Sequence, residues 1–309
     1  MKAVLLDADT LKPEELDISC LTDLPVSLTQ YATTTADERK ERVHDADIIL
    51  VNKVVLDAEV LRHAKQCKYI GVLATGTNNI DKDWCGQHGI EVANVEGYGT
   101  DAVAQHALML LLNLSTSFAP YARDVNAGKW SAGPHFCLLD HPVMELAGKH
   151  LVIVGYGELG QRFAEMAKAM GMRVTVAARP GKPDDDRPSL DSLLPDADVV
   201  SLHCLLTEDS HHLINAQRLS KMKPSAFLIN TARGALIDET ALLQALKNGD
   251  IAGAGLDGLS TEPPPADHPL LNTGLPNLLI TPHSAWVAKE ARQRLVNIAA
   301  GRLSAFLSK

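Results

Sequence analysis

The sequence lacks paired cysteines. Five cysteines are scattered among 309 residues, and no two of them form a Cys-X-X-Cys motif. An odd, unclustered set argues against a disulfide framework and indicates free thiols in a reducing compartment. We therefore expect a cytoplasmic protein, and we predict no metal site. The five residues are Cys20, Cys67, Cys85, Cys137 and Cys204.

A basic block is also missing. The formal net charge is −9, from 29 Lys and Arg against 38 Asp and Glu. This balance argues against nucleic acid and anionic membranes as partners. A small anionic substrate is still compatible with it, because one buried arginine can outweigh a distant surface charge.

Long apolar runs are absent as well. No run approaches the ~18 residues that suggest a transmembrane helix, and the longest lies around residues 107–114. The N-terminal "MKAVLLDADT" has too short an apolar segment for a signal peptide. With 46% hydrophobic and 22% charged residues, the composition is that of a soluble globular protein. The length suits two domains.

The chain does contain strand-like apolar segments that alternate with helical ones, which predicts parallel sheets. Two such series predict an α/β protein with two doubly wound domains. We place the first, discontinuous domain at residues 1–99 and 284–309, and the second at 100–283. Strands are expected at 2–7, 46–52, 68–74, 151–154, around 174–178, and at 197–204, 225–232, 251–258 and 277–283. Helices are expected at 56–64, at 101–117 with Thr100 as its cap, and at 284–307.

The segment "LVIVGYGELG" carries Gly155, Gly157 and Gly160 in the spacing GxGxxG. In such a loop the first glycine permits a tight turn, the second lets the backbone approach a pyrophosphate, and the third lets helix and strand pack closely. The phosphates then lie at the positive N-terminus of the helix. Because a strand precedes the loop and a helix and strand follow it, we interpret it as a dinucleotide site rather than an ordinary βαβ turn.

The end of the next strand holds Ala178 and Arg179 where such folds usually hold an acid. An acid there binds the ribose 2′-hydroxyl of NAD, whereas an arginine accommodates the 2′-phosphate of NADP. Arg179, with Lys182 nearby, therefore predicts that NADP(H) is preferred over NAD(H). Two alternatives stay open: the acids at 184–186 could offset these cations, and Arg179 could be a solvated loop residue.

Three motifs further along each place one ionisable residue at the end of a strand. They are "INTARGALID" with Arg233, "LDGLSTEPPPADHPLL" with Glu262, and "TPHSAW" with His283. Each residue alone has an ordinary explanation, as a surface ion pair, a loop acid or a core histidine. Ligands bind outside the carboxyl ends of strands in open α/β sheets. Because the three residues follow a nucleotide-binding motif in the sequence, together they predict one catalytic cleft.

These motifs resemble the D-isomer-specific 2-hydroxyacid dehydrogenase family over nearly the whole chain. Within the family, the sequence is most similar to glycerate dehydrogenases, also called hydroxypyruvate reductases. The resemblance also rests on "ATGTNNID" (74–81), "VAQHALMLLLNL" (103–114), "FCLLDHPVMELAGK" (136–149) and "TPHSAWVAKEARQRL" (281–295). It implies a flavodoxin-like substrate-binding domain, a Rossmann domain, and a homodimer formed through the helix at 101–117. That helix could equally be a core helix of the monomer.

The reaction that the resemblance implies is hydride transfer between NAD(P)H and a small 2-keto acid. Hydroxypyruvate would give D-glycerate, and glyoxylate would give glycolate. Arg233 would bind the carboxylate and carbonyl of the substrate and stabilise negative charge on the carbonyl oxygen. His283, also in contact with substrate, would donate the proton, and Glu262 would orient the imidazole and favour its charged form. The cofactor would carry the hydride.

The resemblance also implies binding contacts. The backbone amides of Thr75 and Gly76 would bind the substrate carboxylate, and Lys53 either borders this cleft or is a solvated loop lysine. Two residues depart from the family pattern: Leu205 replaces a usual proline, and Gly258 replaces a usual apolar residue. The implied cofactor contacts are Thr100, Glu158, Leu159, His203, Thr207, Thr231 and Asp257, the last facing the nicotinamide carboxamide.

Alternative functions remain on the same fold. Formate dehydrogenases carry glutamine where Glu262 stands, and phosphoglycerate dehydrogenases often add a C-terminal regulatory domain, which we do not expect here. A nucleotide-sensing binding protein without catalysis is a further alternative. The intact set of Arg233, Glu262 and His283 argues against it.

Overall fold

The computed structural model describes residues 1–309, which form two compact units. Unit 1 comprises Met1–Gly99 and Val287–Lys309, and unit 2 comprises Thr100–Trp286. The chain thus returns to unit 1 after Trp286, three residues later than the boundary that we placed after residue 283.

Unit 1 contains a parallel five-stranded sheet in the order β2-β1-β3-β4-β5, which is the flavodoxin-like order. Its central strands, β3 and β4, are fully buried apolar runs, as expected for strands covered on both faces. The edge strands β2 and β5 were not predicted, because they are short and carry polar residues. The strands are β1 (Lys2–Leu5), β2 (Ser27–Gln30), β3 (Ile48–Val51), β4 (Tyr69–Val72) and β5 (Glu91–Ala93).

Short helices and the C-terminal helix α12 (Lys289–Leu307) complete unit 1. Phe306 of α12 packs on Tyr69 of β4, with ring centroids 4.8 Å apart. The buried Arg292 donates to the carbonyl of Leu11 at 2.6 Å, which ties α12 to the N-terminal segment. The other helices are α1 (Ser19–Thr22), α2 (Arg39–Val43), α3 (Ala58–Leu61), α4 (Lys82–Gln87), η1 (Ala8–Thr10) and η2 (Pro13–Glu15).

Unit 2 contains a parallel six-stranded sheet in the order β11-β10-β9-β8-β6-β7. The chain passes from β6 outward to β7 and then back to β8 on the other side of β6, which makes a topological switch point between β6 and β8. Every strand overlaps a predicted one. The four inner strands β6, β8, β9 and β10 are fully buried, whereas β7 and β11 at the edges are only partly buried. The strands are β6 (His150–Val154), β7 (Arg173–Val176), β8 (Val199–Leu202), β9 (Phe227–Asn230), β10 (Gly253–Asp257) and β11 (Leu278–Thr281).

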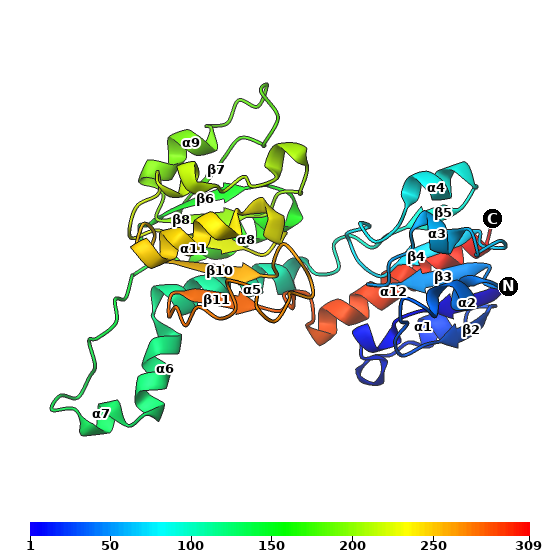
Figure 1. The fold of residues 1–309 in the computed structure, drawn as a ribbon, viewed down its shortest axis with the longest axis horizontal. Coiled ribbons are helices and arrows are strands. Elements are labelled where there is room, and N and C mark those ends of the chain that lie inside the picture. The colour runs from blue at the N-terminus through cyan, green and yellow to red at the C-terminus, as the bar shows by residue number, and fades with distance from the viewer. The chain divides into compact units, whose positions relative to one another are not determined.

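The helices of unit 2 cover both faces of this sheet, as Figure 1 shows. They are α5 (Thr100–Ser115), α6 (Phe118–Asn126), α7 (Lys129–Ala132), α8 (Glu158–Ala169), α9 (Leu190–Leu193), α10 (Ala216–Leu219), α11 (Glu239–Asn248), η3 (Leu194–Asp196), η4 (Glu208–Ser210) and η5 (Gly234–Leu236). Helix α5 packs against β9, β10 and α8, and its buried face is apolar. It is therefore a core helix of unit 2. Thr100 is its first residue, and the Thr100 hydroxyl binds Glu158 at 3.2 Å.

An arm made of residues 118–143 leaves the six-stranded sheet of unit 2. Figure 1 shows α6 and α7 extending away from that sheet before the chain returns toward β6. These helices were not predicted from the sequence. No buried residue occurs in either of them, so the arm contributes little to the core of its own unit.

No single helix has the length and apolarity to cross a membrane; only α5 and α6 counted together meet those criteria, and they are bent by 62°.

Candidate active site

The predicted residues of unit 2 gather at the carboxyl ends of its strands. All strand pairs in this sheet are parallel, so the loops that follow the strands share one edge. The loops contribute the glycine motif after β6, Arg179 after β7, His203 after β8, Thr231 and Arg233 after β9, Asp257 and Glu262 with β10, and His283 after β11.

The three glycines have the geometry that a dinucleotide loop requires. Gly155 has a φ of +93°, and a Cβ there would lie 2.4 Å from the backbone nitrogen of Cys204. A Cβ at Gly160 would lie 2.1 Å from the carbonyl oxygen of Gly155. A Cβ at Gly157 would meet nothing within 4 Å. The first and third glycines are thus required by close packing, whereas the second faces open space.

That open space lies at the N-terminus of α8. Gly157 is the N-cap of this helix, and Glu158 and Leu159 are its first two residues. Their N–H groups donate to no acceptor in the structure. Unpaired N–H groups at a helix start bind anions, so the residues present fit the pyrophosphate of a dinucleotide.

Two buried polar atoms without partners lie at the same edge. They are Oγ1 of Thr231 and Nδ1 of His203. The other ring nitrogen of His203 binds Oγ of Ser201 at 2.9 Å. Burial lowers the pKa of His203 to about 4, so its ring is neutral at pH 7. Buried polar atoms are seldom left unpaired, and a bound nucleotide would supply the missing partners. Thr207, by contrast, is exposed and bonded to Ser210 within its own loop.

The loop after β7 is organised around a buried carboxylate. Asp185 accepts from the backbone N–H and from Nε of Arg179, both at 3.1 Å. It also accepts from Nε of Arg187 at 2.8 Å. The hydrogen bond from the Arg187 side chain, followed by the backbone N–H of Arg179, holds the pKa of Asp185 far below its usual range. Of the three acids in this loop, Asp185 does pair with Arg179, while Lys182 is exposed and has no ion pair.

The same contacts leave most of Arg179 accessible. The Arg179 side chain is 64% exposed, whereas the Asp185 side chain is only 6% exposed. The turn between them is fixed, because the N–H of Lys182 donates to the carbonyl of Arg179 at 3.2 Å and Gly181 supplies a φ of +69°. Asp185 therefore orients the Arg179 side chain, and the exposed part of that side chain is accessible to a ligand.

Glu262 and His283 form a hydrogen-bonded pair. Nδ1 of His283 lies 2.7 Å from Oε2 of Glu262, and the other oxygen, Oε1, accepts the N–H of Leu259 at 3.1 Å. The side chains of His283 and Glu262 are 33% and 37% exposed, so the pair is reachable from solvent. A Cβ at Gly258 would lie 2.1 Å from Oε1 of Glu262. The departure from the family pattern at Gly258 therefore makes room for Glu262.

Burial alone, the largest influence on Glu262, raises the pKa of this carboxyl. The hydrogen bond and charge of His283, the N–H of Leu259 and the charge of Arg233 together outweigh burial, so the pKa of Glu262 lies below its ordinary value. The carboxylate is thus charged in the neutral range. The residue after Arg233 packs on the same backbone, since a Cβ at Gly234 would lie 2.0 Å from the carbonyl carbon of Leu259. The structure thus brings the segments of all three predicted catalytic residues together.

Asp257 fixes the turn that carries His283. Its Oδ1 accepts from Oγ1 of Thr281 at 2.6 Å and from the N–H of Ser284 at 2.8 Å, and its Oδ2 accepts from the N–H of Ala285 at 2.8 Å. These bonds explain why α12 begins at Lys289 rather than at residue 284: the N–H groups of 284 and 285 are held by Asp257 in a turn. Asp257 thus has an anchoring role that the sequence analysis missed.

His106 extends this anchoring network into α5. The Thr281 hydroxyl donates to the Asp257 carboxylate, so its oxygen accepts from Nε2 of His106 at 2.8 Å. Burial lowers the pKa of His106, and the charge of Asp257 partly opposes that effect. A neutral His106 is therefore a donor at the back of the His283 turn. In the sequence, a polar histidine within the mostly apolar segment 103–114 could have indicated this role.

In unit 1, Thr75 and Gly76 lie in the loop after β4. Their backbone N–H groups donate to no acceptor in the structure. The loop itself is held in place, because the Thr75 hydroxyl donates to Val95 at 2.9 Å and Asn94 donates to the Thr75 carbonyl at 2.7 Å. Lys53 follows β3, and its backbone N–H donates to the buried Asp7. Two free donors on a fixed loop can bind a carboxylate.

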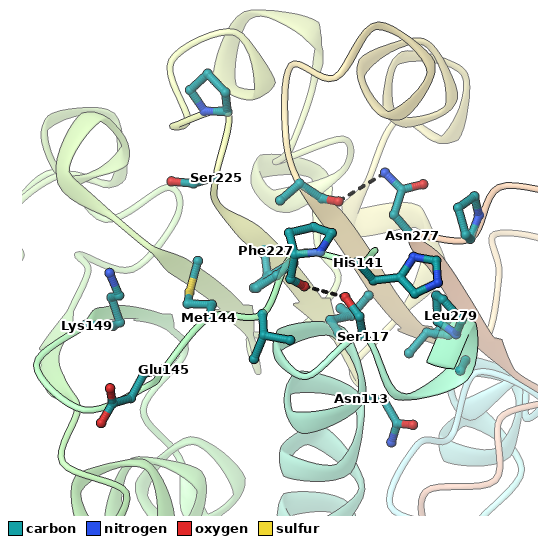
Figure 2. Close-up of a pocket in the computed structure, with 18 of the residues that line it drawn as sticks. Asn113, Ser117, His141, Met144, Glu145, Lys149, Ser225, Phe227, Asn277 and Leu279 are labelled. Carbon is teal, nitrogen blue, oxygen red and sulfur yellow. Dashed lines mark hydrogen bonds between the residues drawn. The ribbon is translucent and has the colours of Figure 1, made fainter. Parts of the chain in front are cut away.

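A cavity of about 950 Å³ lies elsewhere in unit 2. Figure 2 shows it bordered by Ser117, the returning segment with His141 and Met144, and Phe227 and Asn277 at the amino ends of strands. None of the predicted site residues lines it. The candidate site is therefore the polar edge at the carboxyl ends, opposite to this cavity. No cluster of metal-ligating side chains occurs in the structure.

Comparisons with known proteins identify the family of the chain. Residues 108–285 match the family model "D-isomer specific 2-hydroxyacid dehydrogenase, NAD binding domain". The chain is 41% identical to a glycerate dehydrogenase of Methylorubrum extorquens, covering 99% of this chain and 96% of that protein. It is 39% identical to a hydroxypyruvate reductase of Blautia hydrogenotrophica, covering 99% and 97%.

Among solved structures, an acyclic imino acid reductase (Bsp5) in complex with NADPH and D-Arg is similar, with a TM-score of 0.85 and 28% identity over 100% of this chain and 97% of that one. The similarity thus covers both units. The chain belongs to the D-isomer-specific 2-hydroxyacid dehydrogenase family and is an oxidoreductase.

Proposed function

We propose that the protein reduces hydroxypyruvate and glyoxylate, to D-glycerate and glycolate, and prefers NADPH. The observation that carries the catalytic assignment is the 2.7 Å pair of His283 and Glu262 at the carboxyl edge of the sheet. A paired imidazole is a suitable proton donor to a carbonyl oxygen. Relatives named for glycerate and hydroxypyruvate support the substrate class.

The residues of this chain would divide the reaction as follows. The N–H groups of Thr75 and Gly76 bind the substrate carboxylate, and Arg233 binds the carboxylate and carbonyl together and stabilises charge on the carbonyl oxygen. Since Nδ1 of His283 is bonded to Glu262, Nε2 is the atom that passes its proton to that oxygen. When bound, the nicotinamide supplies the hydride.

The cofactor preference is proposed from the loop after β7. No acid takes the ribose-binding place there, and Arg179 is mostly exposed above the carboxylate that orients it. A guanidinium held in this way suits a phosphate monoester. The NADPH in the structure of the similar imino acid reductase is compatible with this assignment. Replacing Arg179 with Asp should reverse the order of kcat/KM for NADPH and NADH.

Steady-state kinetics test the whole proposal. The oxidation of NADPH and of NADH is followed with hydroxypyruvate, glyoxylate and pyruvate in turn. We expect the first two acids to be reduced best, and their esters or amides not to be reduced, because Arg233 needs the carboxylate. Turnover of an amide at the rate of the acid would contradict the role of Arg233. Equal efficiency with both cofactors, unchanged by Arg179→Ala, would contradict the cofactor preference.

We further propose a cytoplasmic homodimer, formed through the arm rather than through the buried face of α5. Phe136 and Leu139 in the arm are 91% and 87% exposed, and Phe118 and Trp130 are also exposed. An apolar surface of this kind on a projecting segment indicates a protein partner, and two identical arms can bury each other around a twofold axis. Sedimentation velocity should give a dimer for the wild type and a monomer for Phe136→Asp with Leu139→Asp.

A further inference from the structure

A second carboxylate, Glu239, connects the segment of Arg233 with the loop of Glu262. Glu239 is the first residue of α11. Its Oε1 accepts the backbone N–H of Ser260 at 2.7 Å. Its Oε2 accepts the Ser260 hydroxyl at 2.6 Å and faces Nε2 of His268 at 3.2 Å. The side chains of Glu239 and His268 are only 15% and 10% exposed. We call Glu239, Ser260 and His268 the Glu239 cluster.

The protonation of His268 follows from its other contact. The backbone N–H of Leu270 donates to Nδ1 of His268 at 3.3 Å. Nδ1 is therefore an acceptor, so the ring proton is on Nε2 and points to Glu239. All three groups around Glu239 are thus donors, and the cluster is satisfied with a neutral imidazole. Charge-assisted bonds of this kind are stronger than bonds between neutral groups.

The cluster lies where the two catalytic segments touch. A Cβ at Gly234, the residue after Arg233, would lie 2.0 Å from the carbonyl carbon of Leu259 and 2.3 Å from the nitrogen of Ser260. The backbone N–H of Leu259 also donates a hydrogen bond to Oε1 of Glu262. The backbone at 259–260 is therefore packed against the Arg233 turn, bonded to Glu239, and bonded to Glu262.

From these contacts we infer that Glu239 is a positioning residue, which sets the place of the Glu262 carboxylate relative to Arg233 and His283. It acts through the backbone at 259–260 and has no contact of its own with His283. Without Glu239, the loop from Gly258 to His268 would lose two bonds near its start, at Ser260, and one at its end, at His268. Glu262 would then bond His283 less often and less directly. This inference rests on the proposed role of Glu262 in supporting His283.

A double-mutant cycle separates positioning from simple stabilisation. The variants are Glu239→Ala, Glu262→Gln and the pair, and the quantity measured is kcat/KM for reduction across pH. Small displacements in an active site can cost up to about 10²-fold, so we expect Glu239→Ala to lower kcat/KM about tenfold or more and to move the high-pH limb as Glu262→Gln does. In the Glu262→Gln background, Glu239→Ala should then cost about twofold or less.

Asp191 provides a matched control. Its carboxylate also accepts three bonds, two from Arg218 at 3.2 and 2.8 Å and one from Lys221 at 2.7 Å. It joins α9 to α10 and contacts none of the catalytic residues. Asp191→Ala should lower Tm as Glu239→Ala does, leave the pH limb in place, and be additive with Glu262→Gln.

Three milder variants keep the test decisive where Glu239→Ala unfolds. His268→Gln retains a donor at the place of Nε2 and should keep most of the activity, whereas His268→Ala should not. Ser260→Ala removes the hydroxyl donor alone. For each variant, the Kd for NADPH, measured by protein fluorescence, should change less than twofold, because the cluster acts on Glu262 and not on the glycine loop.

The possible failures are distinguishable. If Glu262→Gln is impaired but Glu239→Ala costs the same fold in both backgrounds, the positioning role is wrong and the proposed function stands. If Glu262→Gln has wild-type reduction at every pH, the proposed role of Glu262 is wrong, and the inference about Glu239 is wrong with it.

Discussion

Two hydrogen-bonded pairs that each contain a carboxylate lie at the same edge of the six-stranded sheet, and they are held in different ways. Glu262 and His283 are 21 residues apart in sequence, come from different loops, and each has backbone contacts that fix it. Asp185 and Arg179 are six residues apart within one loop, and the arginine is mostly exposed. The first pair joins distant segments; the second organises a local turn.

The difference indicates what each pair can control. A pair fixed from both sides can hold a proton donor in one geometry, as chemistry on a carbonyl requires. A pair with one buried and one exposed partner can present a cation to a ligand without taking part in the reaction. Changes at the first pair should therefore alter rate, and changes at the second should alter the choice of cofactor.

The largest effect is expected for His283→Ala. This change removes the proposed proton donor while Glu262 and Arg233 remain, and general acid catalysis is typically worth ~10²–10⁴-fold. We expect kcat for reduction to fall by that factor, with the Kd for NADPH nearly unchanged. Single-turnover kinetics and fluorescence titration measure the two quantities. A loss of less than tenfold would place the proton donor elsewhere.

Arg233→Ala should follow in size. Removing one group that stabilises developing charge on an oxygen costs roughly 10²–10³-fold in kcat, and the loss of carboxylate binding should raise KM as well. The combined change in kcat and KM for hydroxypyruvate is the measurement. A raised KM with wild-type kcat would mean that Arg233 binds the substrate but does not stabilise the transition state. The same change should also weaken the ionisation of Glu262, because the charge of Arg233 contributes to its lowered pKa.

Most of the fold was predictable because its strands are buried on both faces. Fully apolar runs such as that of β3 identify strands directly, whereas β2 and β5 at the edges of unit 1 carry polar residues and were missed. The two helices of the arm were also missed, and neither of them contains a buried residue. The edge of the sheet at which the site lies followed from parallel topology.

The contacts that support the site were less predictable. Arg233, Glu262 and His283 stand in recognisable motifs, but the roles of Asp257, His106 and Glu239 depend on contacts between segments far apart in sequence. Even within one loop, the sequence could not show which of the acids at 184–186 turns inward. That choice depends on the fixed turn at Gly181 and on the second arginine, Arg187.

The third prediction concerns pH and the charge of Glu262. Because the pKa of Glu262 is lowered, its carboxylate is charged across the neutral range and favours a protonated imidazole beside it. Glu262→Gln removes the charge but keeps a hydrogen-bonding group, so the high-pH limb of reduction should move to lower pH. Oxidation at high pH, which needs a neutral imidazole, should suffer less. Profiles of kcat/KM against pH in both directions test this. A limb that stays in place would mean that Glu262 only orients the ring.

The smallest effect, and the one that best sharpens the comparison, is expected for Asp185→Asn. Charge alone predicts tighter binding of NADPH, because a negative group near the 2′-phosphate is gone. The geometry predicts the opposite, since Asp185 accepts bonds from both Arg179 and Arg187, and an amide cannot accept all of them. Fixing one flexible side chain on binding costs about 0.5–1.5 kcal/mol, which is about 2- to 12-fold in Kd. The exposed Arg179 is screened by solvent, so the charge effect is small. We therefore expect the Kd for NADPH to rise by that factor and the Kd for NADH to stay constant.

Asp186→Asn, which removes the same charge from an exposed neighbour with no bond to either arginine, is the control and should slightly tighten NADPH binding. Tighter NADPH binding in both variants would show that Asp185 only repels the phosphate and does not orient Arg179.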